Sequence, residues 1–170
     1  MDHDQKVQKI LAGRTSSGTL RSRESNTVEF KQSFNKGNIA TYAKTMAAYA
    51  NNSGGYIIFG ITDSPRMIVG LKNDNFDNLK QEVFTDAINS LFSPAIDWEM
   101  GMIVLNEEIE GDNGVIVTEQ KKIGWIYTIE SEMKPVIAQK DNSSETFLRA
   151  MCFIVIGRET AKLSPLKWSG

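Results

Sequence analysis

Residues 54–62 form the nearly continuous apolar run GGYIIFGIT, and no other segment constrains the fold as much. Such a run, preceded by glycines, predicts a β-strand that is covered on both faces. The segment before it, residues 38–52, has apolar residues at helical spacing and predicts a helix capped by Asn38, with these side chains inward: Ile39, Ala43, Met46, Ala47 and Ala50. We therefore expect a layered domain in which at least one helix packs on a sheet.

The rest of the chain alternates between helical and strand patterns. Residues 4–13 predict a short amphipathic helix, and residues 78–92 predict a second main helix with Leu79, Val83, Ala87, Ile88 and Leu91 facing inward. We expect strands at 27–34, 97–105, 114–119, 124–130, 135–139 and 146–156, with residues 67–71 as the hairpin partner of the apolar run.

These elements predict the fold class α+β. We expect one compact domain in which two main helices pack on a mixed, mostly antiparallel sheet. By residue number, this divides the chain into an N-terminal helix and loop (1–19), the main domain (20–163) and a C-terminal tail (164–170).

Composition excludes several classes of protein. The 170 residues include one cysteine, Cys152, and one histidine, His3, too few for a zinc site of the Cys/His kind, so a bound metal would need oxygen ligands. We expect Cys152 to fill the core and His3 to lie near a frayed terminus. No apolar run reaches the roughly 18 residues of a membrane span, and the start lacks an apolar signal region. We therefore expect a cytoplasmic protein without a membrane partner.

Charge is distributed unevenly along the chain. The formal balance is +4 over residues 1–44, −8 over residues 45–113 and +2 over residues 114–170. This pattern is typical of a basic face on an acidic body, although unevenly charged surface loops explain it equally well.

Three carboxylates and a lysine form the candidate site. Glu29 and Lys31 lie two residues apart in an alternating strand and therefore share its polar face. Glu24 is five residues from Glu29, so the two converge only if Glu24 lies before the strand in a turn, as the surrounding SRESN favours. Asp63 follows the apolar run. Each acid has an ordinary alternative, as a surface or turn residue, and Lys31 would either touch a phosphate or only pair with Glu29.

At this point the chain resembles the Schlafen AlbA-like domain family. The pattern is E-x4-E-F-K, a helix ending in A-x-A-N-x-x-G-G, and an apolar strand ending in G-[IV]-x-D. The matching residues are Glu24, Glu29, Phe30, Lys31, Ala48, Ala50, Asn51, Gly54, Gly55, Gly60, Ile61 and Asp63. Weaker matches are Pro135, Val136, Gly157, Arg158 and Thr160, so that the resemblance covers about residues 20–163.

The resemblance implies a function. Nuclease members of this family cleave transfer and ribosomal RNA with three acidic residues and a divalent metal, which places Glu24, Glu29 and Asp63 as ligands of Mg²⁺ or Mn²⁺ and as catalytic residues. The vertebrate nucleases contain two such lobes in tandem and a zinc site that this composition does not supply. We therefore expect a homodimer to provide the second lobe.

Physical chemistry explains why such a site needs a cation. Carboxylates alone repel a phosphodiester, whereas carboxylates that hold Mg²⁺ or Mn²⁺ neutralise it and lower the pKa of bound water. Basic residues near the motifs would contact the nucleic-acid backbone without reading its sequence. The candidates are Arg21, Arg23, Lys36, Lys121, Lys122 and Arg158.

Through this resemblance, the sequence implies a metal-dependent endoribonuclease acting on structured, tRNA-like RNA, with Lys31 assisting. It leaves open a non-catalytic DNA- or RNA-binding domain, and a protein-interaction lobe of a defence or counter-defence system. A P-loop ATPase has no support, because G-x4-G-K-[ST] is absent. We expect Gly54 and Gly55 to serve the helix exit, Asn51 to bond local backbone, and Trp98 and Trp125 to pack rather than stack on bases.

Overall fold

The computed structural model describes residues 1–142, 151–156 and 159–163. Within these residues it contains three α-helices, a short 3₁₀ helix and eight strands. The helices are α1 (His3–Ala12), η1 (Lys36–Asn38), α2 (Ile39–Ala50) and α3 (Gln81–Leu91). The strands are β1 (Val28–Lys31), β2 (Gly55–Phe59), β3 (Phe92–Ser93), β4 (Trp98–Glu110), β5 (Ile116–Thr128), β6 (Ile137–Ala138), β7 (Cys152–Ile156) and β8 (Glu159–Leu163).

The strands form two sheets rather than the single sheet that the sequence predicted. Their orders are β1-β2-β5-β4 and β3-β6-β7-β8. The first sheet is mixed, because β1 and β2 are parallel and its other pairs are antiparallel. The expected α+β class is confirmed. Among the described residues, no helix has the length and apolar character needed to cross a membrane.

Strand β2 is buried on both faces, as its sequence predicted. Ile57 and Phe59 belong to a cluster with α2 and α3, whereas Tyr56 and Ile58 belong to a second cluster with Val7 of α1. Since β1 and β2 are parallel, the chain between them must cross over, and α2 supplies that crossover. Residues 67–71 do not form the expected hairpin strand, because only an isolated bridge joins Ile61 to Ile68.

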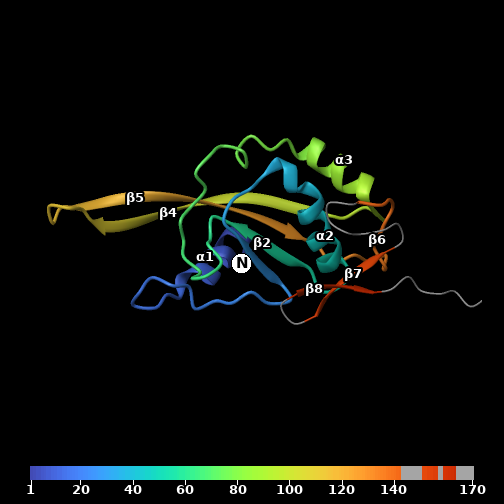
Figure 1. Cartoon of the computed structure of the whole chain (residues 1–170), viewed down its shortest axis with the longest axis horizontal. Helices are drawn as coiled ribbons and strands as arrows, with labels where there is room; N and C mark the ends of the chain where they lie inside the picture. Colours follow the sequence, from blue (N-terminus) through green and yellow to red (C-terminus); the bar gives the residue numbers. More distant parts are fainter. Residues whose placement is uncertain (143–150, 157–158, 164–170) are drawn as a thin grey trace, which may run out of the picture.

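Strands β4 and β5 form one long hairpin that projects from the body (Figure 1). The two strands predicted at 114–119 and 124–130 are a single strand, because residues 116–128 continue the pairing with β4 without interruption. Trp125 lies over Gly101, where an added Cβ would come within 2.3 Å of the indole. Trp125 is buried and Trp98 packs against the core, so both tryptophans pack as expected.

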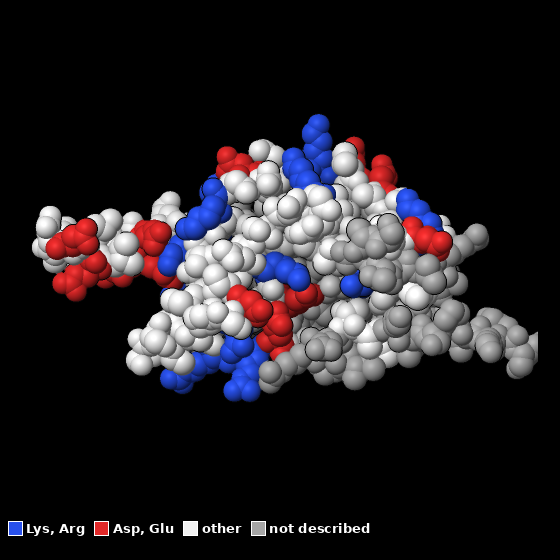
Figure 2. All heavy atoms as spheres, in the orientation of Figure 1, with Lys and Arg blue, Asp and Glu red and all other residues white. Residues whose placement is uncertain are grey.

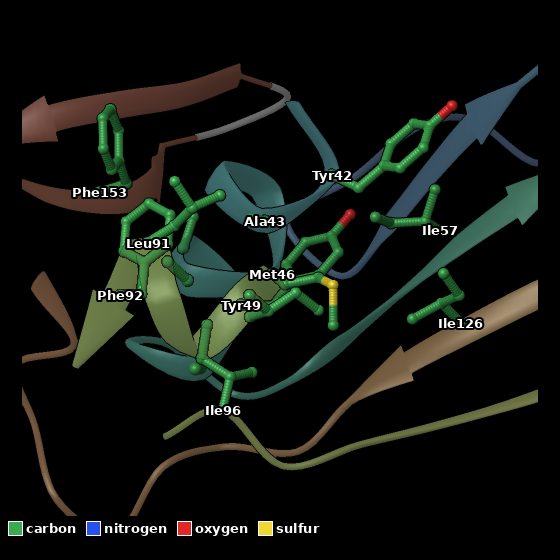
Figure 3. Close-up of a cluster of buried hydrophobic side chains, with 14 of the residues drawn as sticks. Tyr42, Ala43, Met46, Tyr49, Ile57, Leu91, Phe92, Ile96, Ile126 and Phe153 are labelled. Carbon is green, nitrogen blue, oxygen red and sulfur yellow. The ribbon is translucent and has the colours of Figure 1, made fainter. Parts of the chain in front are cut away.

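Helix α2 lies between the two sheets and is buried on almost all sides. The sequence predicted one apolar stripe, but Tyr42, Thr45 and Tyr49 are buried as well. Figure 3 shows the reason: α2 places side chains between Ile57 and Ile126 of the first sheet and Phe153 of β7. In α3 the expected inward Val83 is 59% exposed, and Phe84 is buried in its place.

The side chain of Asn51 joins α2 to the second sheet. Its Nδ2 donates to the carbonyl oxygens of Val136 (2.9 Å) and Phe153 (3.0 Å), and its Oδ1 accepts from the Val136 N–H (2.7 Å). Asn51 therefore bonds backbone, as predicted, but of residues distant in sequence rather than local ones. Cys152, expected in the core, is half-buried beside it, and burial raises the pKa of the thiol.

Helix α1 covers the other face of the first sheet and is held there by its first turn. Asp4 accepts a hydrogen bond of 2.7 Å from the Trp125 indole. The His3 ring lies 4.5 Å from that of Tyr127, and its Nδ1 is 2.5 Å from the Tyr56 hydroxyl. The expectation that His3 lies near a frayed end is wrong, because these contacts fix it.

The Asn51 contacts predict a large stability effect. Replacing Asn51→Ala leaves three backbone groups without their partner, and we expect the free energy of unfolding to fall by about 2–4 kcal/mol. Urea denaturation measures this change. Asn52→Ala is the matched control, since no side-chain hydrogen bond of Asn52 occurs among the described residues, and a comparable fall in both variants would contradict the role of Asn51.

Candidate functional site

A tight turn before β1 places Glu24 beside the strand. Ser25 and Val28 form an antiparallel bridge, and the turn between them folds residue 24 back along β1. The Glu24 Oε1 accepts a hydrogen bond of 3.1 Å from the Phe30 N–H. The predicted position of Glu24, in a turn before the strand, is therefore confirmed.

Glu29 and Lys31 share one face of β1, while Phe30 is buried on the other. The Lys31 Nζ lies 2.8 Å from the Glu29 Oε1, and both side chains are partly exposed. Burial lowers the pKa of the Lys31 ammonium, but Glu29 and then Glu24 raise it more, and the pKa ends above its ordinary value. The ammonium thus stays charged and offsets the acids around it.

These three side chains lie in one cleft of about 370 Å³ formed by β1, α2 and β8. Its lining is mostly polar, with two acids, two lysines and five hydroxyl groups. The residues are Glu24, Ser25, Val28, Glu29, Lys31, Thr41, Lys44, Thr45, Tyr49 and Thr160. The cleft therefore joins the first motif of the sequence to the weakly matched Thr160 near its end.

Helix α2 contributes residues that our sequence analysis missed. Thr41, Thr45 and Tyr49 recur every four residues and form a polar stripe on a helix that is otherwise apolar, with Lys44 beside them. This interval of four between polar residues is visible in the sequence and could have indicated a polar face on the helix. Burial and the nearby Glu29 and Glu24 raise the pKa of Tyr49, so that its hydroxyl is a donor rather than a base.

Asp63 does not line this cleft. Asp63 is exposed in the turn after β2. Two hydrogen bonds join that turn to the loop before β1: the Leu20 N–H donates to the Arg66 carbonyl, and the Arg66 Nε donates to the Ser22 carbonyl. Ile61 and Ile68 at the base of the turn pack into the α1-side cluster, whereas the cleft opens toward α2. Among the described residues no group of three His, Cys, Asp or Glu side chains is placed to hold a metal ion.

The predicted metal site of three acids therefore does not fit this geometry, because only Glu24 and Glu29 line the cleft. Glu24 uses Oε1 for the Phe30 N–H and Glu29 uses Oε1 for Lys31. Each keeps its Oε2, which has no hydrogen-bond or ion-pair partner among the described residues. Two carboxylate oxygens together with hydroxyl groups are the hard ligands that Mg²⁺ and Mn²⁺ prefer, with water completing the shell.

The predicted nucleic-acid contacts divide into paired and exposed residues. Lys121 pairs with Glu107 at 2.6 Å, and Lys122 pairs with Asp77 at 2.8 Å, so carboxylates already offset their charge. Arg21, Arg23 and Lys36 are exposed. Arg158 lies outside the described residues.

Charge on the visible face is mixed. In Figure 2 basic and acidic atoms lie side by side near the middle of this face, and acidic atoms gather on the projecting β4–β5 hairpin. No continuous basic area covers the visible part of the described surface. A ligand of this face would therefore meet positive charge only locally.

Gly54 and Gly55 allow the chain to leave α2 and enter β2. Gly54 has a φ of +77° and its N–H ends α2 by donating to the Tyr49 carbonyl. A Cβ on Gly55 would come within 2.8 Å of the Tyr49 ring. The expectation that these glycines form the helix exit is confirmed, and close packing adds a second reason for them.

Known proteins are similar to this chain in sequence and in fold. Residues 24–158 match the family described as Schlafen, AlbA_2. Uncharacterized ATP-binding protein UU034 of Ureaplasma parvum serovar 3 is 59% identical over 161 residues, which are 95% of this chain and 45% of that protein. The chain thus spans less than half the length of this relative.

Among solved structures, the fold is similar to the DIP2311 protein from Corynebacterium diphtheriae, with a TM-score of 0.53 and 18% identity. The match covers 94% of this chain and 26% of that one. At this identity the likeness concerns the fold alone.

The Glu29–Lys31 pair predicts a measurable pKa change. In Glu29→Gln we expect the pKa of Lys31 to fall below its wild-type value, because the largest raising influence is lost while burial remains. Stability from this pair is present below the ordinary lysine pKa of 10.5 and is lost as the pH rises through the raised value. NMR titration of the Lys31 Cε resonance measures the change; Glu24→Gln should give a smaller fall, and an unchanged pKa in Glu29→Gln would contradict the pairing.

Proposed function

Because the chain belongs to the Schlafen, AlbA_2 family, we propose that it is a nucleic-acid-processing protein that cleaves structured, tRNA-like RNA in the cleft between β1, α2 and β8. The supporting observation is that Glu24 and Glu29 line one cleft next to the ammonium group of Lys31, and that one carboxylate oxygen of each acid has no partner among the described residues. Residues 24–31 and residue 160 meet there although they lie far apart in sequence.

In this proposal Glu24 and Glu29 hold one Mg²⁺ or Mn²⁺, and Asp63 takes no part. Such a cation, when held there, would neutralise phosphate charge and would lower the pKa of a water molecule. The hydrogen bond from Phe30 and the ion pair with Lys31 orient the two carboxylates before substrate binds.

The other cleft residues bind and orient the phosphate. Lys31 lies at the acids and offers positive charge to phosphate oxygens, while Thr41, Thr45 and Thr160 offer hydroxyl donors along the walls. Tyr49 remains protonated, and its buried hydroxyl donates to the Tyr56 carbonyl (3.4 Å), so it shapes the cleft floor and does not contact the phosphate. The exposed Arg21 and Arg23 precede Glu24 directly, where they would contact the backbone of a bound strand without selecting a base.

The assembly we propose is a homodimer. A single lobe of this kind offers one Glu24–Glu29 cleft, whereas the nucleases that the sequence resembles contain two lobes that together enclose the RNA. A second copy would supply the missing wall, and sedimentation of the protein with and without tRNA measures the copy number.

A second candidate is a non-catalytic nucleic-acid-binding domain. One observation favours it: Lys31 already neutralises Glu29, and the third predicted acid lies elsewhere. Such a domain would bind RNA or DNA in EDTA as well as in Mn²⁺ and would leave the strand intact.

Incubation of the purified protein with tRNA and Mn²⁺ tests the proposal. We expect Glu29→Gln and Glu24→Gln to reduce cleavage by at least about 100-fold, the usual scale for losing an essential charged group of a site, and EDTA to abolish it. Gel analysis of end-labelled tRNA measures the rate.

Asp63→Asn is the matched control, since it makes the same acid-to-amide change outside the cleft. It should cleave at the wild-type rate. Equal cleavage by wild type and Glu29→Gln would refute the catalytic role, and binding that persists in EDTA would then support the second candidate.

A further inference from the structure

A second cleft, of about 510 Å³, lies between α1 and the turn that enters β2. Lys6 and Lys9 line it from α1, Gly54 lines it from the turn, and Tyr56 and Tyr127 line it from the sheet. Val28 lines this cleft and the Glu24–Glu29 cleft, so the two adjoin across the start of β1. Lys6 and Lys9 precede the residues that match the family.

The two lysines of this cleft differ from several other lysines of the described structure in lacking an acidic partner. Lys31, Lys121 and Lys122 each pair with a carboxylate. Lys6 and Lys9 are exposed and have no carboxylate within ion-pair distance among the described residues. Their spacing of three places both on one face of α1, where like charges repel and an anion between them would relieve the repulsion.

The opposite wall of the cleft is a fixed aromatic surface. The Tyr127 ring lies 4.7 Å from that of Tyr56 and 4.5 Å from that of His3. Tyr56 is almost fully buried and lies in hydrogen-bond contact with His3, so this group of rings is packed in place before any ligand arrives. Tyr127 keeps partial exposure in the cleft. Aromatic faces of this kind stack with any nucleic-acid base.

Gly54 keeps the space beside Tyr127 open. Any Cβ at this position would come within 3.0 Å of the Tyr127 hydroxyl and 2.7 Å of the Thr128 carbonyl. The cleft therefore combines two ammonium groups that have no acidic partner in the described part of the chain, one aromatic wall and a side-chain-free turn.

We propose that this cleft binds a nucleotide, with its base against Tyr127 and its phosphate between Lys6 and Lys9. The nucleotide is either free or one residue of a polynucleotide that continues past Val28 into the neighbouring cleft. This inference rests on the proposed function only for the second source, which presupposes a bound strand. Nucleotide binding in this cleft requires no cation and no cleavage.

Binding of two probes to the full chain tests this inference. ATP and a single-stranded oligouridylate are each titrated in EDTA at low salt, so that no cation at Glu24 and Glu29 contributes. We expect the double variant Lys6→Ala, Lys9→Ala to raise Kd about tenfold or more for at least one probe, since two charge-assisted contacts to phosphate are lost.

The matched control is Lys72→Ala, Lys80→Ala, which removes the same charge from exposed lysines outside both clefts and should leave Kd unchanged. The variant Lys6→Arg, Lys9→Arg should retain binding, and Tyr127→Leu should weaken it if the melting temperature is preserved. Weaker binding of ATP in the α1 variant identifies a free-nucleotide site. Weaker binding of the oligonucleotide alone identifies a subsite for a strand.

Two results would overturn the inference: wild-type protein that binds neither probe, or equal effects of the α1 variant and its control. Cleavage by Glu29→Gln is measured separately. RNA cleavage that depends on Glu29, together with no effect of the α1 variant on either probe, would reject the nucleotide site while leaving the proposed function intact.

Discussion

The cleft depends on the amide of Asn51. This side chain ties the end of α2 to the backbone of Val136 and Phe153, and thereby holds the second sheet against the helix. Strand β8 pairs with β7 of that sheet, so the position of Thr160 follows from the same contact. Val136 and Phe153 also pack in the apolar cluster that contains α2, so the hydrogen bonds of Asn51 fix the position of a sheet that apolar burial holds there. A polar residue at a helix end thus helps to set how two sheets enclose one site.

Charge within the cleft is balanced by the chain itself. Two carboxylates in a partly buried cleft would destabilise the fold, but Lys31 offsets them and keeps its own charge. The same ammonium is placed to meet a phosphate. The cleft can therefore exist without ligand and still offer two carboxylate oxygens to a cation. The lysines of β5 differ, because Lys121 pairs with Glu107 of the hairpin and Lys122 pairs with Asp77 of the loop before α3.

Sequence alone predicted the parts of this site that depend on local geometry. Strand parity placed Glu29 and Lys31 together, turn chemistry placed Glu24 before the strand, and the apolar run predicted burial of β2 on both faces. It misplaced Asp63, because the direction of the turn after Gly60 is set by distant contacts with Leu20 and Ser22. The second sheet was missed for a similar reason, since β3 and β6 are two residues each and pair only across long separations.

The most direct test of this account is where Mn²⁺ binds in solution. Paramagnetic broadening of backbone amide NMR signals reports the location without requiring activity. We predict that substoichiometric Mn²⁺ broadens residues 24–31 and 41–49 first, and that Glu29→Gln removes this effect. Broadening centred on Asp63 or on the acidic end of the β4–β5 hairpin, with sharp signals around Glu24 and Glu29, would contradict it.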